Sequence, residues 1–315
     1  MIRKIAVIGA GTMGHGIAQA FATYGYDVVM YDTDPAALHR GLAAIRREQT
    51  MMIEEGFLSD EALERTLAHI ATSTDLAQAV ADRDYAIEAT PEDMALKQNL
   101  LESLDAFMPP HGIIASNTSS LPLAGMMARL GKARQARTMV NHWYNPAHLM
   151  PLVELSFFGN MPQEIFAEVE ALYASIKKQT AKVLKDIPGL VANRIQQGVA
   201  REAFWLIQNG VAEPADIDKA LKFGPAFRYA TTGQLEVADF GGLDIWCVVG
   251  DNLLKAMDNS QQANPLLREK VAEGKLGIKT GEGFYRYPGD KVEEVRARFM
   301  RKLIHQLKAS AFYVD

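Results

Sequence analysis

A glycine-rich segment directly behind a short apolar run constrains the fold of this chain more than any other feature. Residues 5–8 (Ile-Ala-Val-Ile) lead into residues 9–14, which fit the pattern G-x-G-x-x-G. The pattern alone is a weak signal, but here an apolar strand precedes it and a helical pattern follows it. We therefore expect a βαβ unit whose turn holds a pyrophosphate at the helix N-terminus. The predicted cofactor contacts come from Gly9, Gly11, Thr12, Met13 and Gly14.

The second strand of this unit, residues 27–31, ends at Asp32. A carboxylate at that point can accept hydrogen bonds from an adenosine ribose, and it repels a 2′-phosphate. Neither Thr33 nor Asp34 supplies the arginine that such a phosphate would need. The sequence therefore favours NAD over NADP, and the alternative is a glycine turn with a purely structural role.

Strand-like and helix-like segments alternate through the first part of the chain, which is typical of a doubly wound parallel sheet. Expected strands cover residues 85–87, 113–115, 138–141 and 152–158, with a helix at 94–107 and a helical hairpin over 36–71 broken near Gly56. From Pro188 onward the pattern is helical. We predict an N-terminal Rossmann-like α/β domain over residues 1–185 and a C-terminal all-α domain over residues 186–315.

Composition excludes several classes of partner. Asp and Glu number 38 against 33 Lys and Arg, a net charge of −5 that disfavours a nucleic-acid surface. No apolar run approaches the roughly 20 residues of a membrane span. The single cysteine, Cys247, rules out an intramolecular disulfide and a multi-cysteine zinc cluster, so no metal is predicted. These features favour a cytoplasmic protein that acts on a small molecule.

His142 is the histidine that stands out among seven. We expect it to follow the strand that ends at Asn141, where substrate groups gather in a dinucleotide-binding fold. Glu154 lies in the next apolar strand, and a buried carboxylate is costly unless it is paired. An imidazole paired with it would have a fixed tautomer and a free nitrogen to remove a hydroxyl proton. An ordinary buried histidine remains the alternative.

Between Arg3 and Tyr287 the chain contains six motifs: GAGTMGHGIA, EATPEDMALK, ASNTSS, NHWYNPAHLMPLVEL, PGLVANR and KLGIKTGEGFYRY. In these motifs and their order the chain resembles the L-3-hydroxyacyl-CoA dehydrogenases and their relatives, which include lambda-crystallin, L-gulonate dehydrogenase and L-carnitine dehydrogenase. The resemblance implies a Rossmann-like domain, a helical domain that usually dimerises, and hydride transfer from a 3-hydroxyl to NAD. It places the chain in fatty acid or hydroxy acid metabolism.

The resemblance also implies roles for single residues. His142 becomes the base with Glu154 as its partner, while Ser119 and Asn193 contact the reacting oxygen of the substrate. The residues implied to line the cofactor are Glu92, Lys97, Ser119, Asn145 and Lys279. Without the resemblance, Glu92 and Lys97 would be interpreted as a solvated pair at a helix end, and Asn193 as a helix-stabilising residue.

Two departures from the family pattern bear on the substrate. The serine and lysine with which CoA-using members hold the nucleotide of CoA fall on Ile45 and Met52, although Arg46 and Arg47 lie close by. Arg228, in a segment similar to the gulonate and carnitine branch, offers a planar fork for a substrate carboxylate. A structural salt bridge is the alternative role for Arg228.

The leading hypothesis is thus an NAD-dependent dehydrogenase of an L-3-hydroxyacyl substrate, and the alternative is a dehydrogenase of a free hydroxy acid bound by Arg228. A non-catalytic NAD-binding structural protein is a more remote alternative. Beyond Tyr287, a helical stripe from Val292 to Leu307 faces away from several basic residues. We expect that helix to pack on its own chain or on a subunit partner rather than on a membrane.

Overall fold

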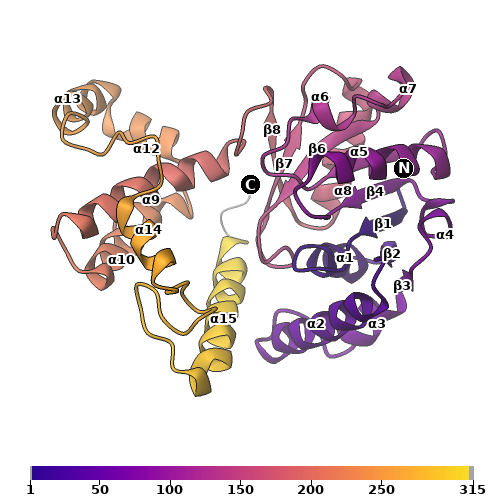
Figure 1. Cartoon of the computed structure of the whole chain (residues 1–315), viewed down its shortest axis with the longest axis horizontal. Coiled ribbons are helices and arrows are strands. Elements are labelled where there is room, and N and C mark those ends of the chain that lie inside the picture. Colours follow the sequence, from indigo (N-terminus) through magenta and orange to yellow (C-terminus); the bar gives the residue numbers. More distant parts are fainter. Residues whose placement is uncertain (1, 312–315) are drawn as a thin grey trace. The chain divides into compact units, whose positions relative to one another are not determined.

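The computed structural model describes residues 2–311. The chain divides into two compact units, one that ends at Val191 and one that begins at Ala192 (Figure 1). The first is an α/β unit and the second is helical, which confirms the expected fold class.

The first unit is built on one eight-stranded sheet with the strand order β3-β2-β1-β4-β5-β6-β7-β8. Its strands are β1 Lys4–Ile8, β2 Asp27–Tyr31, β3 Ile70–Ser73, β4 Tyr85–Glu88, β5 Ile113–Ser116, β6 Thr138–Trp143, β7 Leu152–Ser156 and β8 Gln179–Val183. All neighbours run parallel except β6 and β7, which pair antiparallel. The chain therefore reverses direction once inside the sheet, between β6 and β7.

Helices cover both faces of this sheet, because side chains alternate along each buried strand. The helices of this unit are α1 Gly14–Thr23, α2 Pro35–Glu54, α3 Ala62–Ala68, α4 Leu76–Val80, α5 Met94–Phe107, α6 Leu123–Met126, α7 Lys132–Gln135 and α8 Gln163–Ser175. Ile5 and Val7 pack with residues of α1 and α8 in one core cluster. Ala6 and Ile8 pack with residues of α4, α5 and α6 in the other.

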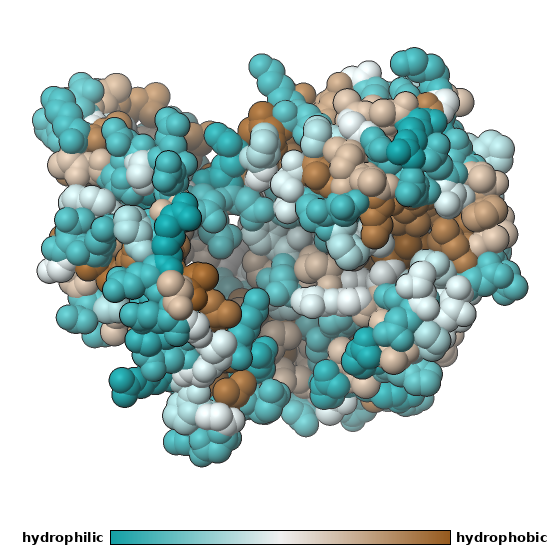
Figure 2. Space-filling view, viewed as in Figure 1, coloured by the Kyte–Doolittle hydropathy of each residue, from teal (hydrophilic) through white to brown (hydrophobic). Residues whose placement is uncertain are grey.

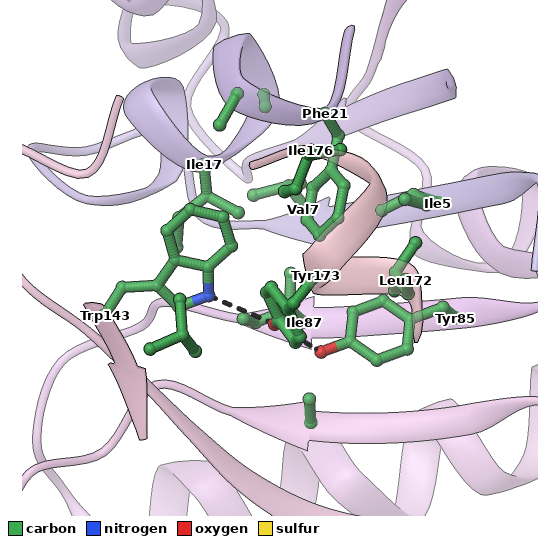
Figure 3. Packing of buried hydrophobic residues seen from close by; sticks show 14 of the residues in the cluster. Ile5, Val7, Ile17, Phe21, Tyr85, Ile87, Trp143, Leu172, Tyr173 and Ile176 are labelled. Atoms are coloured by element: carbon green, nitrogen blue, oxygen red, sulfur yellow. Dashed lines mark hydrogen bonds between the residues drawn. The ribbon is translucent and has the colours of Figure 1, made fainter. Parts of the chain in front are cut away.

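An aromatic group in the first cluster anchors the end of β6 (Figure 3). The Trp143 indole N–H donates to the Tyr173 hydroxyl at 3.2 Å, and that hydroxyl lies 2.8 Å from the hydroxyl of Tyr85. The Phe21 ring packs edge-on against Trp143 at 5.6 Å between centroids. Because Trp143 follows His142 directly, this packing fixes the backbone that carries the histidine.

The structure corrects several expected boundaries. The predicted helical hairpin over 36–71 gives way to β3 at Ile70, and β8 was missed altogether. Both are the outermost strands of the sheet, so their side chains are largely polar and carry no clear alternation. Strand β6 extends to Trp143, so His142 lies inside the strand and not after it.

The second unit consists of helices α9 Ala192–Gln208, α10 Pro214–Phe223, α11 Pro225–Tyr229, α12 Gln234–Gly241, α13 Leu243–Leu253, α14 Pro265–Ala272 and α15 Val292–Ser310, with the 3-10 turn η1 Gly289–Lys291. Large apolar side chains remain exposed on it, and they interrupt its hydrophilic surface in Figure 2. They include Phe223, Phe227, Leu235, Phe240, Leu243, Trp246 and Leu254. No helix in residues 2–311 is long and apolar enough to cross a membrane.

Candidate active site

The carboxyl ends of the parallel strands bring the predicted residues of the first unit to one edge of the sheet. Ile8 at the end of β1 aligns with Tyr31 of β2 and with Glu88 of β4. Glu88 aligns in turn with Ser116 of β5. The segments that follow these strands therefore begin side by side, at the edge where open α/β sheets bind ligands.

Gly9, Gly11 and Gly14 of the first turn are each glycine for a different structural reason. Gly9 has a φ of +101°, a conformation that side chains disfavour. A Cβ on Gly14 would lie 1.7 Å from the carbonyl oxygen of Gly9, so only glycine lets α1 start this close to the turn. A Cβ on Gly11 would meet no described heavy atom within 4 Å. The space over Gly11 is open, as the close approach of a pyrophosphate requires.

Asp32 fixes this turn through both of its carboxylate oxygens. Its Oδ2 accepts the N–H of Ala10 at 2.8 Å, and its Oδ1 accepts the N–H of Asp34 at 3.0 Å. The nearby Arg40 is paired with Asp34 at 3.1 Å. The carboxylate thus presents negative charge beside the glycine turn, which suits the hydroxyls of NAD better than a 2′-phosphate.

His142 and Glu154 are directly opposite each other on β6 and β7. Cross-strand neighbours in an antiparallel pair project to the same face, and Nδ1 of His142 lies 2.8 Å from Oε2 of Glu154. Both side chains are buried. Because the carboxylate accepts, Nδ1 carries the proton and Nε2 of the neutral ring keeps its lone pair. The pair has the form of a general base with an orienting carboxylate.

Tyr144 lies against this pair. Its ring contacts the His142 ring edge-on at 5.3 Å between centroids. Burial, and then the charge of Glu154, raise the pKa of the Tyr144 hydroxyl to about 12. The Tyr144 hydroxyl therefore stays protonated at neutral pH.

Lys97 forms a buried ion pair that the sequence did not reveal. Its Nζ lies 2.7 Å from Oε1 of Glu88, and the two side chains are 1% and 0% exposed. Glu88 also accepts hydrogen bonds from Ser116 and Thr90. Lys97 also forms an ion pair with Glu92 at 3.6 Å, but its side chain is 1% exposed, so the expectation that this pair is solvated is wrong.

Glu92 organises the loop that carries Ser119. Its Oε1 accepts the Thr118 hydroxyl at 2.6 Å, the N–H of Ser119 at 3.2 Å and the N–H of Ser120 at 3.0 Å. On the other side of this loop, the Ser119 carbonyl accepts the N–H of Gly189 at 3.0 Å. The backbone of Ser119 is thus held at both of its polar atoms.

Asn117, in the same loop, was not among the predicted site residues. Its Oδ1 accepts the N–H of Trp143 at 2.8 Å, and its own N–H donates to the Glu88 carbonyl at 2.9 Å. It therefore ties the residue after His142 to the end of β4. A polar residue in the ASNTSS motif was the signal that could have indicated this role.

The other predicted residues are placed as follows. Asn145 is exposed in the loop after β6. Asn193 is half-buried in the first turn of α9, while Arg228 in α11 and Lys279 are exposed. The last three belong to the helical unit, and their contacts to the reacting groups stay predictions. In the described part of the chain, no group of three or more His, Cys, Asp or Glu is arranged to hold a metal.

The argument from Ile45 and Met52 does not stand. Both are core residues of α2, 0% and 5% exposed, and Met52 accepts a hydrogen bond from Gln19. A side chain at either position would face the core and not a nucleotide. Arg46 and Arg47, by contrast, are exposed on the same helix.

The fold and this site define a dinucleotide-dependent dehydrogenase, with a glycine turn for the cofactor and a histidine–carboxylate pair at the same edge of the sheet. Residues 4–187 match the NAD binding domain of 3-hydroxyacyl-CoA dehydrogenase, and residues 189–287 match its C-terminal domain. The chain belongs to the 3-hydroxyacyl-CoA dehydrogenase family and is an NAD-dependent oxidoreductase that acts on CH–OH groups.

Relatives within the family act on different substrates. The chain is 39% identical over 285 residues to a probable 3-hydroxybutyryl-CoA dehydrogenase of Deinococcus radiodurans, covering 90% of this chain and 100% of that protein. It is 33% identical over 304 residues to 5-formyl-3-hydroxy-2-methylpyridine 4-carboxylate 5-dehydrogenase of Mesorhizobium japonicum, covering 96% and 97%.

Solved structures show the same two branches. A crystal structure of the pyridine carboxylate 5-dehydrogenase, described as an NAD⁺-dependent dismutase, has a TM-score of 0.89 at 32% identity and covers 99% of both chains. The (S)-3-hydroxybutyryl-CoA dehydrogenase of Ralstonia eutropha has a TM-score of 0.73 at 36% identity and covers 91% of this chain and 99% of that one.

Proposed function

We propose that the enzyme oxidises the 3-hydroxyl of an L-3-hydroxyacyl substrate, with His142 as the base that takes the hydroxyl proton. The observation that carries this proposal is the 2.8 Å contact between His142 Nδ1 and Glu154, which leaves Nε2 free to accept. NAD, when bound, would supply the acceptor for the hydrogen of the same carbon as hydride. Glu154 stabilises the imidazolium that forms, and the product is the 3-oxo compound.

Ser119 and Asn193 are proposed to donate to the reacting oxygen. The fixed backbone of Ser119 supports this role, because a preorganised donor does not have to reorient during the reaction. Donors of this kind typically contribute about 3 kcal/mol of transition-state stabilisation each. Four residues are proposed to line the cofactor: Glu92, Lys97, Asn145 and Lys279. Glu92 and Lys97 would do so by holding the loop beside it.

We propose that residues 1–185 form the cofactor domain and that residues 186–315 form the substrate and dimerisation domain.

A free carboxylic acid is the second candidate substrate class. Two observations favour it. Arg228 is exposed, and the match to a relative named for a pyridine carboxylate covers 97% of that relative. In this version the Arg228 guanidinium binds the carboxylate of the substrate in two-pronged geometry. The thioester class is supported by the more identical 3-hydroxybutyryl-CoA relative.

One assay distinguishes these classes. NADH formation is measured with 3-hydroxybutyryl-CoA, longer 3-hydroxyacyl-CoAs, 3-hydroxybutyrate, L-carnitine and L-gulonate, and with 5-formyl-3-hydroxy-2-methylpyridine 4-carboxylate. His142→Gln is expected to lower turnover about 100- to 10,000-fold on the true substrate while it leaves NADH affinity intact. A variant that retains more than about a tenth of the wild-type rate would refute the base assignment.

Arg228→Met then tests the free-acid version. If a carboxylate binds there, kcat/KM should fall on the order of 10- to 150-fold, and Arg228→Lys should recover little. If the substrate is a CoA thioester, Arg228→Met should have little effect, and reversing the charges of Arg46 and Arg47 should weaken thioester binding instead. Wild-type activity on thioesters alone would eliminate the free-acid version.

We further propose a cytoplasmic homodimer formed through the helical unit. The exposed apolar side chains of α10 to α13 support this, since monomeric proteins rarely expose so many large apolar groups together. Sedimentation of the full chain should give a dimer, and Phe240→Asp with Trp246→Glu should give a monomer. Wild-type protein that sediments as a monomer at micromolar concentration would contradict the proposed dimer.

A role in fatty acid metabolism is proposed only if the substrate is a CoA thioester.

A further inference from the structure

Next to the glycine turn, a histidine outside the proposed chemistry is held between two acceptors. Nδ1 of His15, in the first turn of α1, lies 2.8 Å from the carbonyl oxygen of Gly11. Nε2 of the same ring lies 3.1 Å from Oε1 of Glu48 on α2. A carbonyl and a carboxylate only accept hydrogen bonds, so both ring nitrogens must carry protons for both contacts to form. The geometry therefore requires a charged imidazolium.

The surroundings of His15 favour that charge. Burial lowers the pKa of His15, but the hydrogen bond and charge of Glu48 and the carbonyl of Gly11 outweigh it and raise the pKa above its ordinary value. Arg47, also on α2, acts against this rise. Oε2 of Glu48 is buried and accepts no hydrogen bond from the described residues, so the hydrogen bond to this side chain comes from His15 through Oε1.

The hydrogen bond from His15 to the Gly11 carbonyl also bears on the direction of the next backbone N–H, that of Thr12. The peptide that joins Gly11 to Thr12 is trans, so its N–H points opposite to its C=O. The same carbonyl also accepts the backbone N–H of His15 at 3.3 Å, and with the carbonyl directed at His15 the N–H of Thr12 is directed away from the helix. That is the side from which a diphosphate would accept it.

The same cluster reaches the loop behind His142. Oε2 of Glu48 lies 3.1 Å from Nδ1 of His148. Burial lowers the pKa of His148 to about 4, so His148 is neutral at pH 7 and leaves His15 as the positive partner of Glu48. Nζ of Lys178, the residue before β8, lies 2.6 Å from the Ala147 carbonyl and faces His148, and burial lowers the pKa of Lys178 to about 7. A Cβ on Gly16 would lie 3.2 Å from Cβ of Ala147, so α1 and this loop are in close contact.

We propose that His15, charged and held by Glu48, is a cofactor-positioning residue that directs the Thr12 N–H at the diphosphate of NAD and adds a titratable component to NAD affinity. This proposal rests on NAD binding at the glycine turn and does not involve the base His142. When pH rises and His15 loses its proton, one of its two hydrogen bonds and its positive charge are lost. NAD(H) affinity therefore falls toward alkaline pH.

The test is NADH binding, followed by fluorescence between pH 6 and pH 9 on the full-length protein. In the wild type the dissociation constant should rise with pH. His15→Ala should bind NADH about two- to tenfold more weakly at pH 6, the effect of one net hydrogen bond, and should lose the pH dependence. Glu48→Gln should move the rise to lower pH, because the imidazolium loses its carboxylate. His15→Gln, which keeps one donor for the Gly11 carbonyl, should recover part of the affinity with a flat profile.

Matched controls are His39→Ala and Glu54→Gln, two exposed residues of α2, which should behave like the wild type. In steady-state assays, His15→Ala should raise KM for NAD and leave kcat nearly unchanged. A wild-type pH profile in His15→Ala, or an unshifted profile in Glu48→Gln, would overturn the proposal. A wild-type protein that binds no NADH would instead refute the cofactor site itself, and melting curves identify any variant that fails to fold.

Discussion

Glu154 accepts the backbone N–H of Val191 through Oε1 at 2.8 Å, while its Oε2 accepts His142. Val191 is the last residue of the first compact unit, directly before α9. One carboxylate thus orients the proposed base and fixes the point where the chain leaves the α/β unit. Both oxygens act as acceptors, and this is the property that an amide lacks.

Glu154→Gln is therefore expected to be more disruptive than its similar shape suggests. The amide offers one acceptor and one donor, so either His142 or the N–H of Val191 must face an NH₂ group. We expect turnover to fall severely, though less than in His142→Gln, and the melting temperature to drop as well. Steady-state kinetics and thermal unfolding measure the two effects. A variant with reduced turnover and unchanged melting would show that the Val191 contact contributes nothing.

Asp32→Ala is expected to weaken NAD binding more than NADP binding. The carboxylate favours the free 2′-hydroxyl of NAD and repels the 2′-phosphate of NADP. Its removal therefore deprives NAD of a contact and removes a repulsion from NADP. Asp32 also accepts the N–H of Ala10, so its loss should loosen the glycine turn and weaken the binding of both cofactors. The informative quantity is therefore the ratio of the two dissociation constants. Titrations with both cofactors give this ratio. An equal loss for the two cofactors would mean that Asp32 acts on the turn alone.

Lys97→Met is expected to destabilise the protein by about 3 to 5 kcal/mol, because it leaves the charge of Glu88 buried without a positive partner. Glu88→Gln combined with Lys97→Met should recover much of this loss, since no buried charge remains. Urea unfolding measures the free energies, and Lys132→Met, at an exposed lysine of α7, is the matched control. If the double variant were as unstable as the single one, buried charge would not be the cause.

His148 predicts an acid sensitivity of folding. Its pKa is about 4 in the folded protein against 6.5 ordinarily, so between these values the unfolded chain binds a proton that the folded chain does not. The free energy of unfolding should therefore fall as pH decreases from about 6.5 to 4, by about 3 kcal/mol from this residue. His148→Gln should flatten this part of the stability curve relative to the wild type. Parallel curves for the two proteins would contradict the assignment.

The sequence predicted the parts of the site that depend on local pattern. The glycine turn, Asp32 and the pairing of His142 with Glu154 follow from strands and turns whose residues lie near each other in the chain or in adjacent strands. The family motifs added Glu92, Lys97 and Ser119. The pairing of His142 with Glu154 could be predicted because a carboxylate is unusual in an apolar strand. The cofactor roles of Glu92, Lys97 and Ser119 stay predictions.

What the sequence did not reveal depends on side-chain partners that no local pattern specifies. Glu88 ends an apolar strand and meets Lys97 one helix later, and no periodicity indicates which carboxylate a buried lysine selects. His15, Glu48 and His148 come from α1, α2 and a loop far along the chain, so they cannot be grouped before the fold is known. The edge strands β3 and β8 are too polar to resemble buried strands.

The reversal between β6 and β7 has a consequence for how such an enzyme can change. Strand register sets His142 opposite Glu154, and the loop of residues 144–151, which joins the two strands, does not set that register. Lengthening or shortening that loop would alter the surroundings of the reacting atoms and leave the proton-transfer pair in place. Selection for a new substrate can therefore act on loop length without repeated loss of the chemistry, which separates what this scaffold recognises from what it does.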